Sequence, residues 1–442
     1  MKRLALKFLG NWRIRPQRRP LLLRGARQVG KTWLVRAHAA SYESFVEINL
    51  EKQAQFIPLF QKKFGDPQQL IRELSLLSGQ KIEIGKTLLF IDEIQECKEA
   101  LLSLRYFKEE LSEQAVIAAG SLLEFIFSEL SFPVGRIEFL HLFPLNFEEF
   151  LMALNREDLV ETIKLQDVSR TLAEPLHELL LDYFTTYSLL GGLPEIVKCY
   201  AESKDLKLCQ NIQQLLIASY REDFHKYAKK TQIQNLRLLF ENVPRLLGQK
   251  FKYSEIDCEL KSRDLSLALT LLEQAGLVYK VYHSSSNGVP LHAQIDPKKF
   301  KVFSLDIGLC HRLLGLELSQ LYLEKKNLLA RRGGIAEQIV AQELISYTPQ
   351  NESPQLHYWH RETAASSAEM DFVIGKNGQV FPLEVKSQRA RSSKSMGIFL
   401  EEKKIYANKG FIISKENFSF HDKVQKLPFY ALLRNLREQI SI

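Results

Sequence analysis

The chain has 442 residues, of which 45% are hydrophobic and 25% charged, and its formal net charge at pH 7 is +8. This composition excludes a disordered or fibrous protein, and no apolar run approaches the length of about 18 residues that a membrane span needs. The length predicts about two to four domains. The five cysteines are scattered without a CxxC pair, so we expect reduced thiols in a cytoplasmic protein without a membrane partner.

Short apolar runs alternate with helical stretches from residue 20 to about residue 150, a pattern typical of a parallel α/β sheet. The predicted strands are residues 20–24, 44–50, 87–91, 115–119 and 136–142. Helical periodicity then continues to about residue 277, interrupted by a turn at residues 191–194. A last segment, from about residue 328, begins with a helix and continues into strands and a further helix.

A glycine motif follows the first predicted strand and precedes a predicted helix; its residues are Gly25, Ala26, Arg27, Gln28, Val29, Gly30, Lys31 and Thr32. In this G-x-x-x-x-G-K-[ST] pattern the glycines let backbone N–H groups turn toward phosphate oxygens beside a helix N-terminus. We expect Lys31 to reach the β- and γ-phosphates and the Thr32 hydroxyl to coordinate Mg²⁺. The motif therefore predicts a P-loop that binds ATP with Mg²⁺.

Two acidic residues, Asp92 and Glu93, follow the apolar run at residues 88–91, as in a Walker B motif. We expect Asp92 to hold Mg²⁺ through water and Glu93 to polarise the attacking water. Binding alone does not need Glu93, so the pair predicts ATP hydrolysis.

Two further residues are candidates for the same site. Ser121 follows the strand at residues 115–119, where a polar side chain can sense the γ-phosphate. Arg136 begins the fifth predicted strand and is a candidate for neutralising charge on the transferred phosphoryl group, in its own subunit or in a neighbour's. A surface arginine is the alternative for Arg136.

These motifs resemble a large family of bacterial and archaeal AAA+-type ATPases that carry a C-terminal domain of unknown function. The resemblance rests on residues 20–32 (PLLLRGARQVGKT), 45–50 (FVEINL), 89–95 (LFIDEIQ), 135–136 (GR), 143–150 (FPLNFEEF), 191–195 (GGLPE), 306–309 (DIGL) and 334–337 (GIAE). It implies a parallel-sheet α/β AAA+ P-loop domain at residues 1–150 and a helical lid or linker at 151–210. It further implies a winged-helix domain with a connector at 211–325 and a restriction-endonuclease-like α/β domain at 326–442.

The middle of the chain has the element order of a winged helix-turn-helix. Residues 236–247, 254–260 and 264–275 are predicted as three short helices, followed by a strand at 278–282 and a turn at 287–288. The third helix would present Lys261, Arg263, Ser266 and Thr270 to DNA. Only two of these four are basic and acidic residues lie among them, so a rigid connector is the alternative.

A predicted hairpin in the last segment brings two carboxylates together. Asn-Gly at residues 377–378 is a favoured two-residue hairpin turn. With that turn, Phe372 lies opposite Leu383 on an apolar face, and Asp371 lies opposite Glu384 on the other face. Opposed carboxylates with Cβ atoms roughly 5 Å apart destabilise a hairpin unless a cation compensates for them. Hard oxygen ligands suit Mg²⁺ or Mn²⁺.

Asp371, Glu384 and Lys386 form a D…ExK pattern similar to the PD-(D/E)xK nuclease superfamily, which the last domain of the family resembles. The resemblance makes Asp371 and Glu384 metal ligands, Glu337 an auxiliary acid from the preceding helix, and Lys386 the residue that orients or activates water. Met370 stands where the superfamily's name has proline, and some members bind nucleic acid without cleaving it. A hairpin in which Glu384 or Glu369 pairs with Lys386 on a solvated face is the alternative.

Three functional hypotheses follow. In the first, ATP turnover gates or loads a DNA-directed nuclease. In the second, the last domain is catalytically inactive and the chain is an ATP-dependent DNA-binding regulator. In the third, the chain is a signalling or scaffold ATPase whose partner is another protein. A homo-oligomer is a further candidate assembly. We expect ATP and Mg²⁺ as cofactors, with a second Mg²⁺ or Mn²⁺ in the last domain under the first hypothesis.

Overall fold

The computed structural model describes residues 2–121, 123–127, 135–323, 333–361, 367–387 and 394–432. Five parallel strands form the N-terminal sheet, as predicted, in the order β2-β3-β4-β1-β5. Their bounds are β1 (Leu21–Arg24), β2 (Ser44–Asn49), β3 (Thr87–Asp92), β4 (Ala115–Ala119) and β5 (Glu138–His141). Because the strands are parallel, the carboxyl ends of β1, β4 and β3 lie side by side at one edge of the sheet.

The two faces of this sheet have separate hydrophobic cores. Leu21 and Leu23 of β1 contribute to one core with α1 and α2, while Leu22 contributes to the other core with α3, α4 and α5. The alternation follows from the pleat, which turns successive side chains to opposite faces. The helices are α1 (Ala5–Arg13), α2 (Lys31–Ala39), α3 (Ile57–Lys63), α4 (Pro67–Ser78), α5 (Lys98–Glu110) and α6 (Leu123–Phe127), with 3₁₀ turns η1 (Ala54–Phe56) and η2 (Ile94–Glu96).

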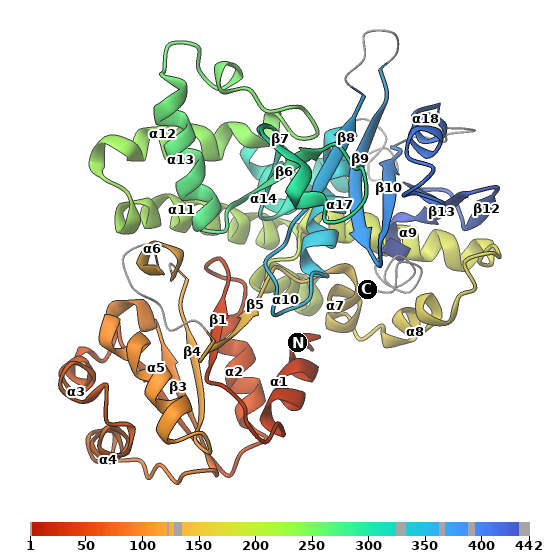
Figure 1. Ribbon diagram of the computed structural model, residues 1–442. Coiled ribbons are helices and arrows are strands. Elements are labelled where there is room, and N and C mark those ends of the chain that lie inside the picture. The colour runs from red at the N-terminus through yellow and green to blue at the C-terminus, as the bar shows by residue number, and fades with distance from the viewer. Residues whose placement is uncertain are drawn as a thin grey trace.

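Helices dominate the middle of the chain, and α11–α13 lie beside the P-loop end of the first sheet (Figure 1). They are α7 (Phe147–Ala153), α8 (Glu157–Leu165), α9 (Glu174–Leu190), α10 (Pro194–Ser203), α11 (Leu206–Tyr227), α12 (Lys230–Asn242), α13 (Ser262–Gln274), α14 (Ile307–Leu313) and α15 (Leu318–Leu323), with 3₁₀ turns η3 (Val243–Arg245) and η4 (Tyr253–Glu255). The turn predicted at residues 191–194 separates α9 from α10. The described residues contain no helix long and apolar enough to cross a membrane.

The three helices expected of a winged helix are only partly present. The first and third correspond to α12 and α13, but the predicted helix at 254–260 was wrong, because only the turn η4 forms there. The Asp257 carboxylate accepts hydrogen bonds from the N–H groups of Glu259 (2.8 Å) and Leu260 (3.3 Å). Such local side-chain bonds compete with the helical backbone ladder and favour a turn.

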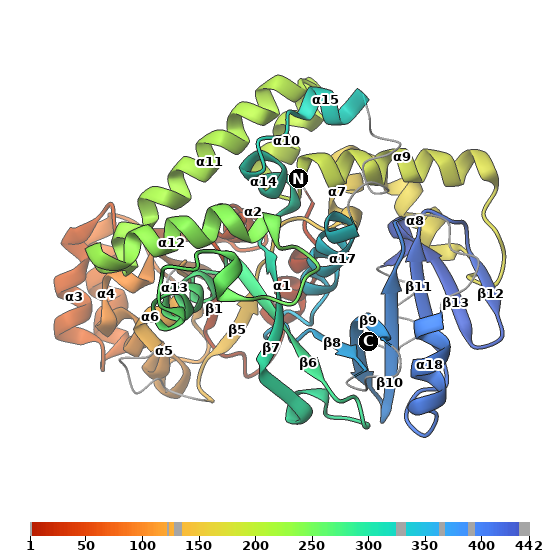
Figure 2. The same ribbon diagram turned by 90° about the horizontal axis from the view of Figure 1, so that it is seen from above.

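An eight-stranded mixed sheet occupies the C-terminal half, in the order β12-β13-β11-β10-β9-β8-β6-β7 (Figure 2). The strands are β6 (Val278–Ser284), β7 (Ile295–Ser304), β8 (His357–His360), β9 (Glu369–Lys376), β10 (Gln379–Val385), β11 (Gly410–Ser414), β12 (Ser419–His421) and β13 (Val424–Pro428). The remaining elements are α17 (Gly333–Ser346), α18 (Lys394–Glu402), η5 (Leu291–Gln294) and η6 (Phe429–Ala431). Strand β6 pairs with β8, so the sheet runs across the boundary predicted at residues 325/326.

The predicted hairpin register is observed between β9 and β10. Gln379 pairs with Lys376, Phe381 with Ile374, and Leu383 with Phe372. The next position along the same ladder carries Asp371 and Glu384. Residues 324–332 and 433–442, which the predicted last segment also covers, lie outside the described residues.

Candidate nucleotide site and C-terminal carboxylate cluster

The P-loop connects the end of β1 to the first turn of α2 and depends on two glycines. Gly25 has φ +141° and Gly30 has φ +92°, both in the region that side chains rarely adopt. A Cβ atom on Gly25 would lie 2.2 Å from the carbonyl oxygen of Leu142. The first glycine is therefore required both by its backbone angle and by the adjacent chain after β5.

Lys31 and Thr32 occupy the positions that a phosphate and Mg²⁺ site needs. The Lys31 Nζ donates to the carbonyl oxygens of Gly25 (2.8 Å) and Ala26 (2.9 Å), and burial lowers the pKa of Lys31 to about 8. The Thr32 hydroxyl donates to Asp92 Oδ2 at 3.0 Å, so the two predicted Mg²⁺ ligands are already in contact. These residues fit Mg²⁺ with ATP, since a hydroxyl, a carboxylate and an ammonium group converge beside a helix N-terminus.

Asp92 and Glu93 lie at the end of β3, as predicted. Burial, and next the charge of Glu93, raise the pKa of Asp92. Asn49, at the end of the neighbouring strand β2, donates from Nδ2 to Asp92 Oδ2 at 3.4 Å. Gln95 donates from Nε2 to Glu93 Oε2. No sequence motif pointed to Asn49 or Gln95. Asn49 lies beside Asp92 because β2 and β3 are neighbouring strands.

Ser121 contacts the P-loop residue Arg27. The Arg27 Nε donates to Ser121 Oγ (3.3 Å), and its Nη1 donates to Asp223 Oδ1 (2.8 Å). The Tyr220 hydroxyl donates to the carbonyl oxygen of Arg27 (2.9 Å). Asp223 and Tyr220 belong to α11, about 190 residues from the P-loop in the sequence. No motif identified them, and only the tertiary structure brings them to this site.

Arg136 has a different environment from the other predicted residues of the nucleotide site. Its Nε donates to Glu109 Oε1 of α5 at 2.9 Å, and 52% of its side chain is exposed. Its recorded ion pair is thus with a surface helix and not with the P-loop. This contact corresponds to the surface arginine that the sequence analysis gave as the alternative.

The carboxylates predicted for a second metal surround a lysine. Lys301 of β7 places Nζ 2.8 Å from Glu369 Oε1, 3.0 Å from Glu337 Oε2 and 3.7 Å from Asp371 Oδ1. Burial lowers the pKa of Lys301, but the three carboxylates outweigh this effect and the pKa is raised overall. Sequence analysis did not identify Lys301, and nothing in its local pattern, between Phe300 and Val302, indicates a role.

The second half of this carboxylate cluster is Glu384 with Lys386, whose Nζ pairs with Glu384 Oε1. Burial raises the pKa of Asp371 to about 6 and that of Glu337 to about 8, each further supported by neighbouring carboxylates. Among the described residues, no three acidic, histidine or cysteine side chains are arranged to hold a metal ion. In this arrangement the residues predicted as ligands do not fit a divalent ion, because the Lys301 ammonium group lies between Glu337 and Asp371 and the Lys386 ammonium group pairs with Glu384.

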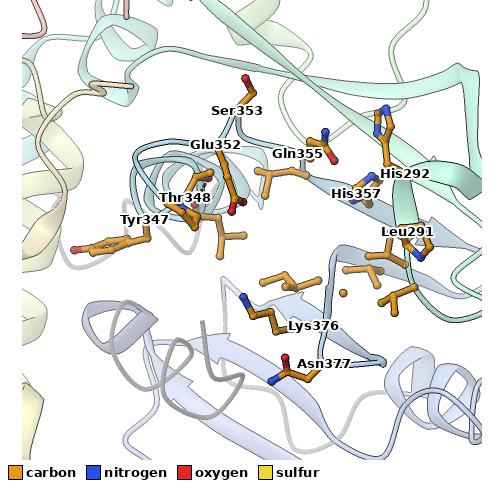
Figure 3. Close-up of a pocket in the computed structure, with 18 of the residues that line it drawn as sticks. Leu291, His292, Tyr347, Thr348, Glu352, Ser353, Gln355, His357, Lys376 and Asn377 are labelled. Atoms are coloured by element: carbon orange, nitrogen blue, oxygen red, sulfur yellow. Dashed lines mark hydrogen bonds between the residues drawn. The ribbon is translucent and has the colours of Figure 1, made fainter. Parts of the chain in front are cut away.

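A cavity of about 840 Å³ lies near the turn of the β9–β10 hairpin (Figure 3). Lys376 and Asn377 line it on one side, His292 and His357 at one end, and Tyr347 at another. Its lining includes Gly375 and Ile374 but neither Asp371 nor Glu384. The cavity is therefore separate from both the P-loop and the carboxylate cluster.

Comparison with protein-family models gives three matches. Residues 17–151 match an AAA domain, residues 181–320 match a domain of unknown function (DUF8612), and residues 332–432 match another domain of unknown function (DUF4143). A comparison with curated proteins gave no match. The AAA match covers the five-stranded sheet and every residue predicted for the nucleotide site.

Several solved structures are similar at low identity. The Walker-type ATPase of Pyrococcus abyssi is 16% identical with a TM-score of 0.45, over 70% of this chain and 94% of that one. A Pyrococcus horikoshii STAND protein with a tetratricopeptide repeat sensor is 14% identical with a TM-score of 0.28, over 79% and 48%. The Orc1 protein of Aeropyrum pernix, solved with DNA, is 15% identical with a TM-score of 0.28, over 74% and 92%. At these TM-scores the likenesses carry no argument about function.

The parallel sheet, the P-loop beside the carboxylates of β3, and the family match agree with one another. This chain contains an AAA-type P-loop ATPase domain that binds ATP.

Proposed function

We propose that the chain is an ATP-hydrolysing switch that transmits the state of its nucleotide site to a nucleic-acid-directed C-terminal domain. The observation that carries this proposal is the contact between the P-loop residue Arg27 and Asp223 of α11. The ion pair joins a loop that wraps phosphate to a helix of the next domain. Any movement of Arg27 on nucleotide binding therefore changes a contact of α11.

Two further contacts connect the P-loop to the middle domain. A Cβ atom on Gly276 would lie 3.4 Å from the backbone nitrogen of Ala26, and one on Gly30 would lie 3.4 Å from Pro194 of α10. Gly276 precedes β6, which pairs with β8 of the C-terminal sheet. The path from P-loop to C-terminal domain thus consists of packed backbone and sheet pairing, which transmit displacement because close-packed interiors deform little.

Each residue predicted for the nucleotide site except Arg136 has a role in ATP turnover. Lys31 stabilises the phosphates, and Mg²⁺, held by Thr32 and Asp92, would neutralise developing charge. Glu93 accepts a proton from the attacking water. Ser121 senses the γ-phosphate together with Arg27. Within its own subunit Arg136 is paired with Glu109 on the surface and has no such role.

The nucleic-acid partner is supported by charge. The net charge is +8, and Lys261 and Arg263 at the start of α13 are exposed. Thr270, another predicted DNA contact, donates instead to the carbonyl oxygen of Ser266 within α13 (3.0 Å). We propose a phosphate contact through Lys261 and Arg263, which gives affinity without sequence specificity.

Metal-dependent cleavage of DNA is the second candidate function, favoured by the opposition of Asp371 and Glu384 with Lys386 beside them. In the observed arrangement Lys301 takes up the carboxylates that this chemistry would use. Binding without cleavage is therefore the better-supported form of the proposal. A nuclease assay with Mg²⁺ or Mn²⁺, with and without ATP, should give no cleavage; ATP-dependent products would favour the second candidate.

Fluorescence anisotropy with labelled DNA tests the switch, at two ionic strengths and with ATP, ADP or no nucleotide. We expect binding that weakens steeply with salt and an affinity that ATP changes by about tenfold. Asp223→Asn should retain ATP binding but reduce the nucleotide effect to less than about twofold. Glu222→Gln, an exposed acid adjacent on the same helix, is the matched control and should behave like the wild type.

Two outcomes would contradict the proposal. An unchanged nucleotide effect in Asp223→Asn would remove the proposed path through α11. Absence of DNA binding at low salt, with and without ATP, would favour the hypothesis that the partner is another protein.

A further inference from the structure

We infer that Lys301 is the built-in cation of the C-terminal carboxylate cluster, so that an ammonium group of the chain itself stands where the acidic pattern predicts a divalent metal ion. The inference concerns the chemistry of the C-terminal domain. It goes beyond the proposed function, because nucleotide coupling through Arg27 and Asp223 does not depend on it.

The lysine and its acids match in number. An ammonium group has three N–H donors, and three carboxylates lie around Lys301 Nζ: Glu369 at 2.8 Å, Glu337 at 3.0 Å and Asp371 at 3.7 Å. Only 1% of the Lys301 side chain is exposed, so water cannot take the place of these partners. The acids come from two elements, α17 and β9, and the lysine comes from a third, β7.

The surrounding structure fixes the lysine at this position. Gln338, next to Glu337 on α17, accepts a hydrogen bond from the N–H group of Ser304 and donates one to its carbonyl oxygen, both at 2.8 Å. This pair of bonds attaches α17 to the end of β7, three residues from Lys301. Gly248 allows the close approach of Glu337, since a Cβ atom there would lie 2.7 Å from Glu337 Oε1.

Two of the remaining carboxylate oxygens have partners of their own. Asp371 Oδ2 accepts a hydrogen bond from the N–H group of Val385 (2.7 Å), and Glu384 Oε1 pairs with Lys386. Glu384 Oε2 is buried and has no hydrogen-bond partner in the part of the chain that the structure describes. Mg²⁺ and Mn²⁺ require about six ligands, many of them oxygens held at short distance. An ion that used Glu337 and Asp371 as ligands would therefore compete with Lys301 for their oxygens.

Charge gives the inference a test. The cluster has four carboxylates and two lysines, a formal charge of −2 when every group is ionised: Glu337, Glu369, Asp371 and Glu384 with Lys301 and Lys386. Removing the Lys301 ammonium group makes the charge −3 and empties the space between three acids. A divalent ion that enters this space replaces the lost charge, so metal should rescue a Lys301 variant and have no comparable effect on the wild type.

The experiment compares the melting temperature of the full-length chain, without nucleotide, in the presence and absence of millimolar Mn²⁺ or Mg²⁺. Lys301→Ala should melt several degrees below the wild type, and Mn²⁺ should restore at least half of that loss by mass action. The wild type and Lys299→Ala, a partly exposed lysine on the same strand, should show no such response. The double variant Lys301→Ala with Asp371→Asn should lose the rescue. Thr32 and Asp92 are present throughout, so any response of the P-loop cancels in the comparison.

Two results obtained with folded protein would overturn the inference. One is a rise in the wild-type melting temperature with Mn²⁺ that Asp371→Asn abolishes, since the cluster would then already hold a metal. The other is a folded Lys301→Ala that does not respond to either metal. If Lys301→Ala does not fold, Lys301→Gln, which keeps an N–H donor, takes its place. Failure of both variants to fold even with Mn²⁺ counts against the inference, and the DNA-binding test of Asp223→Asn is unaffected by either result.

Discussion

Two lysines in acidic surroundings, the half-buried Lys31 and the buried Lys301, differ in what they contact. Lys31 in the P-loop donates to two neutral backbone carbonyls, with Asp92 and Glu93 nearby. Lys301 in the C-terminal sheet lies among three carboxylates. Both patterns, GKT and D…ExK, predict a site for a charged ligand from sequence. At the first site the lysine contacts neutral carbonyl oxygens, which a phosphate can replace. At the second site the lysine is already paired with carboxylates.

The different partners of Lys31 and Lys301 also explain why their pKa values shift in opposite directions. Burial lowers the pKa of Lys31 to about 8, because carbonyl oxygens only partly replace water around the charge. A phosphate would provide the missing negative charge, so Lys31 should bind a phosphate oxygen more strongly than it binds the two carbonyl oxygens. At Lys301 burial acts in the same direction, but the carboxylates outweigh it and raise the pKa. A charge that is already neutralised does not need a ligand.

The largest expected effect is at the P-loop. Lys31→Ala should lower ATP turnover by about two orders of magnitude or more without unfolding the protein, because it removes the charge that faces phosphate.

Glu93→Gln should reduce turnover by about 100-fold or more yet retain ATP, since only the water-polarising group is lost. Steady-state phosphate release and nucleotide binding by filter retention measure the two effects. Turnover by Glu93→Gln at the wild-type rate would remove Glu93 from this role.

The pH dependence of stability should have opposite signs at the two lysines' sites. The folded-state pKa of Glu337 is raised from 4.5 to about 8, so the folded state binds more protons than the unfolded state in that range. Stability therefore falls as pH rises toward 8. Burial lowers the pKa of Lys31 from 10.5 to about 8, so its contribution to stability rises with pH between those values.

Thermal melting between pH 6.5 and 8 isolates the first of these effects, since the contribution of Lys31 changes between about pH 8 and 10.5 and the unfolded-state pKa of Glu337 lies below this window. The wild type should lose stability across it, and Glu337→Gln should lose less. Glu343, whose pKa burial also raises to about 8, contributes to the remaining decrease. Lys31→Ala serves as the control and should keep the wild-type slope. Equal slopes for Glu337→Gln and the wild type would mean that the carboxylate cluster does not hold a proton at neutral pH.

The smallest expected effect is at Arg136. Because it pairs with Glu109 on the surface, Arg136→Ala should change ATP turnover by less than about twofold in dilute solution, the range expected of a surface ion pair. Turnover measured over a range of protein concentrations provides the check. A loss of about tenfold or more that appears only at high concentration would identify Arg136 as a residue supplied to a neighbouring subunit, consistent with the known size of such contributions.

The sequence by itself determined the features that depend on contiguous residues. All five strands of the first sheet, the P-loop and the acidic pair at the end of β3 follow from short apolar runs and from glycines at fixed spacing. The register of β9 and β10 follows from the Asn-Gly turn, because a two-residue turn leaves one pairing that keeps apolar side chains on one face.

Only the tertiary structure decided which distant residues complete each site. Asp223 contacts Arg27 because α11 packs beside the P-loop. Lys301 contacts Asp371 because β7 and β9 belong to one sheet. Local pattern cannot supply such pairs, since their contact depends on strand order and helix packing and not on spacing. The same limit explains why the D…ExK pattern predicted a metal site: a sequence motif records which acids come together, whereas the fold decides which cation lies between them.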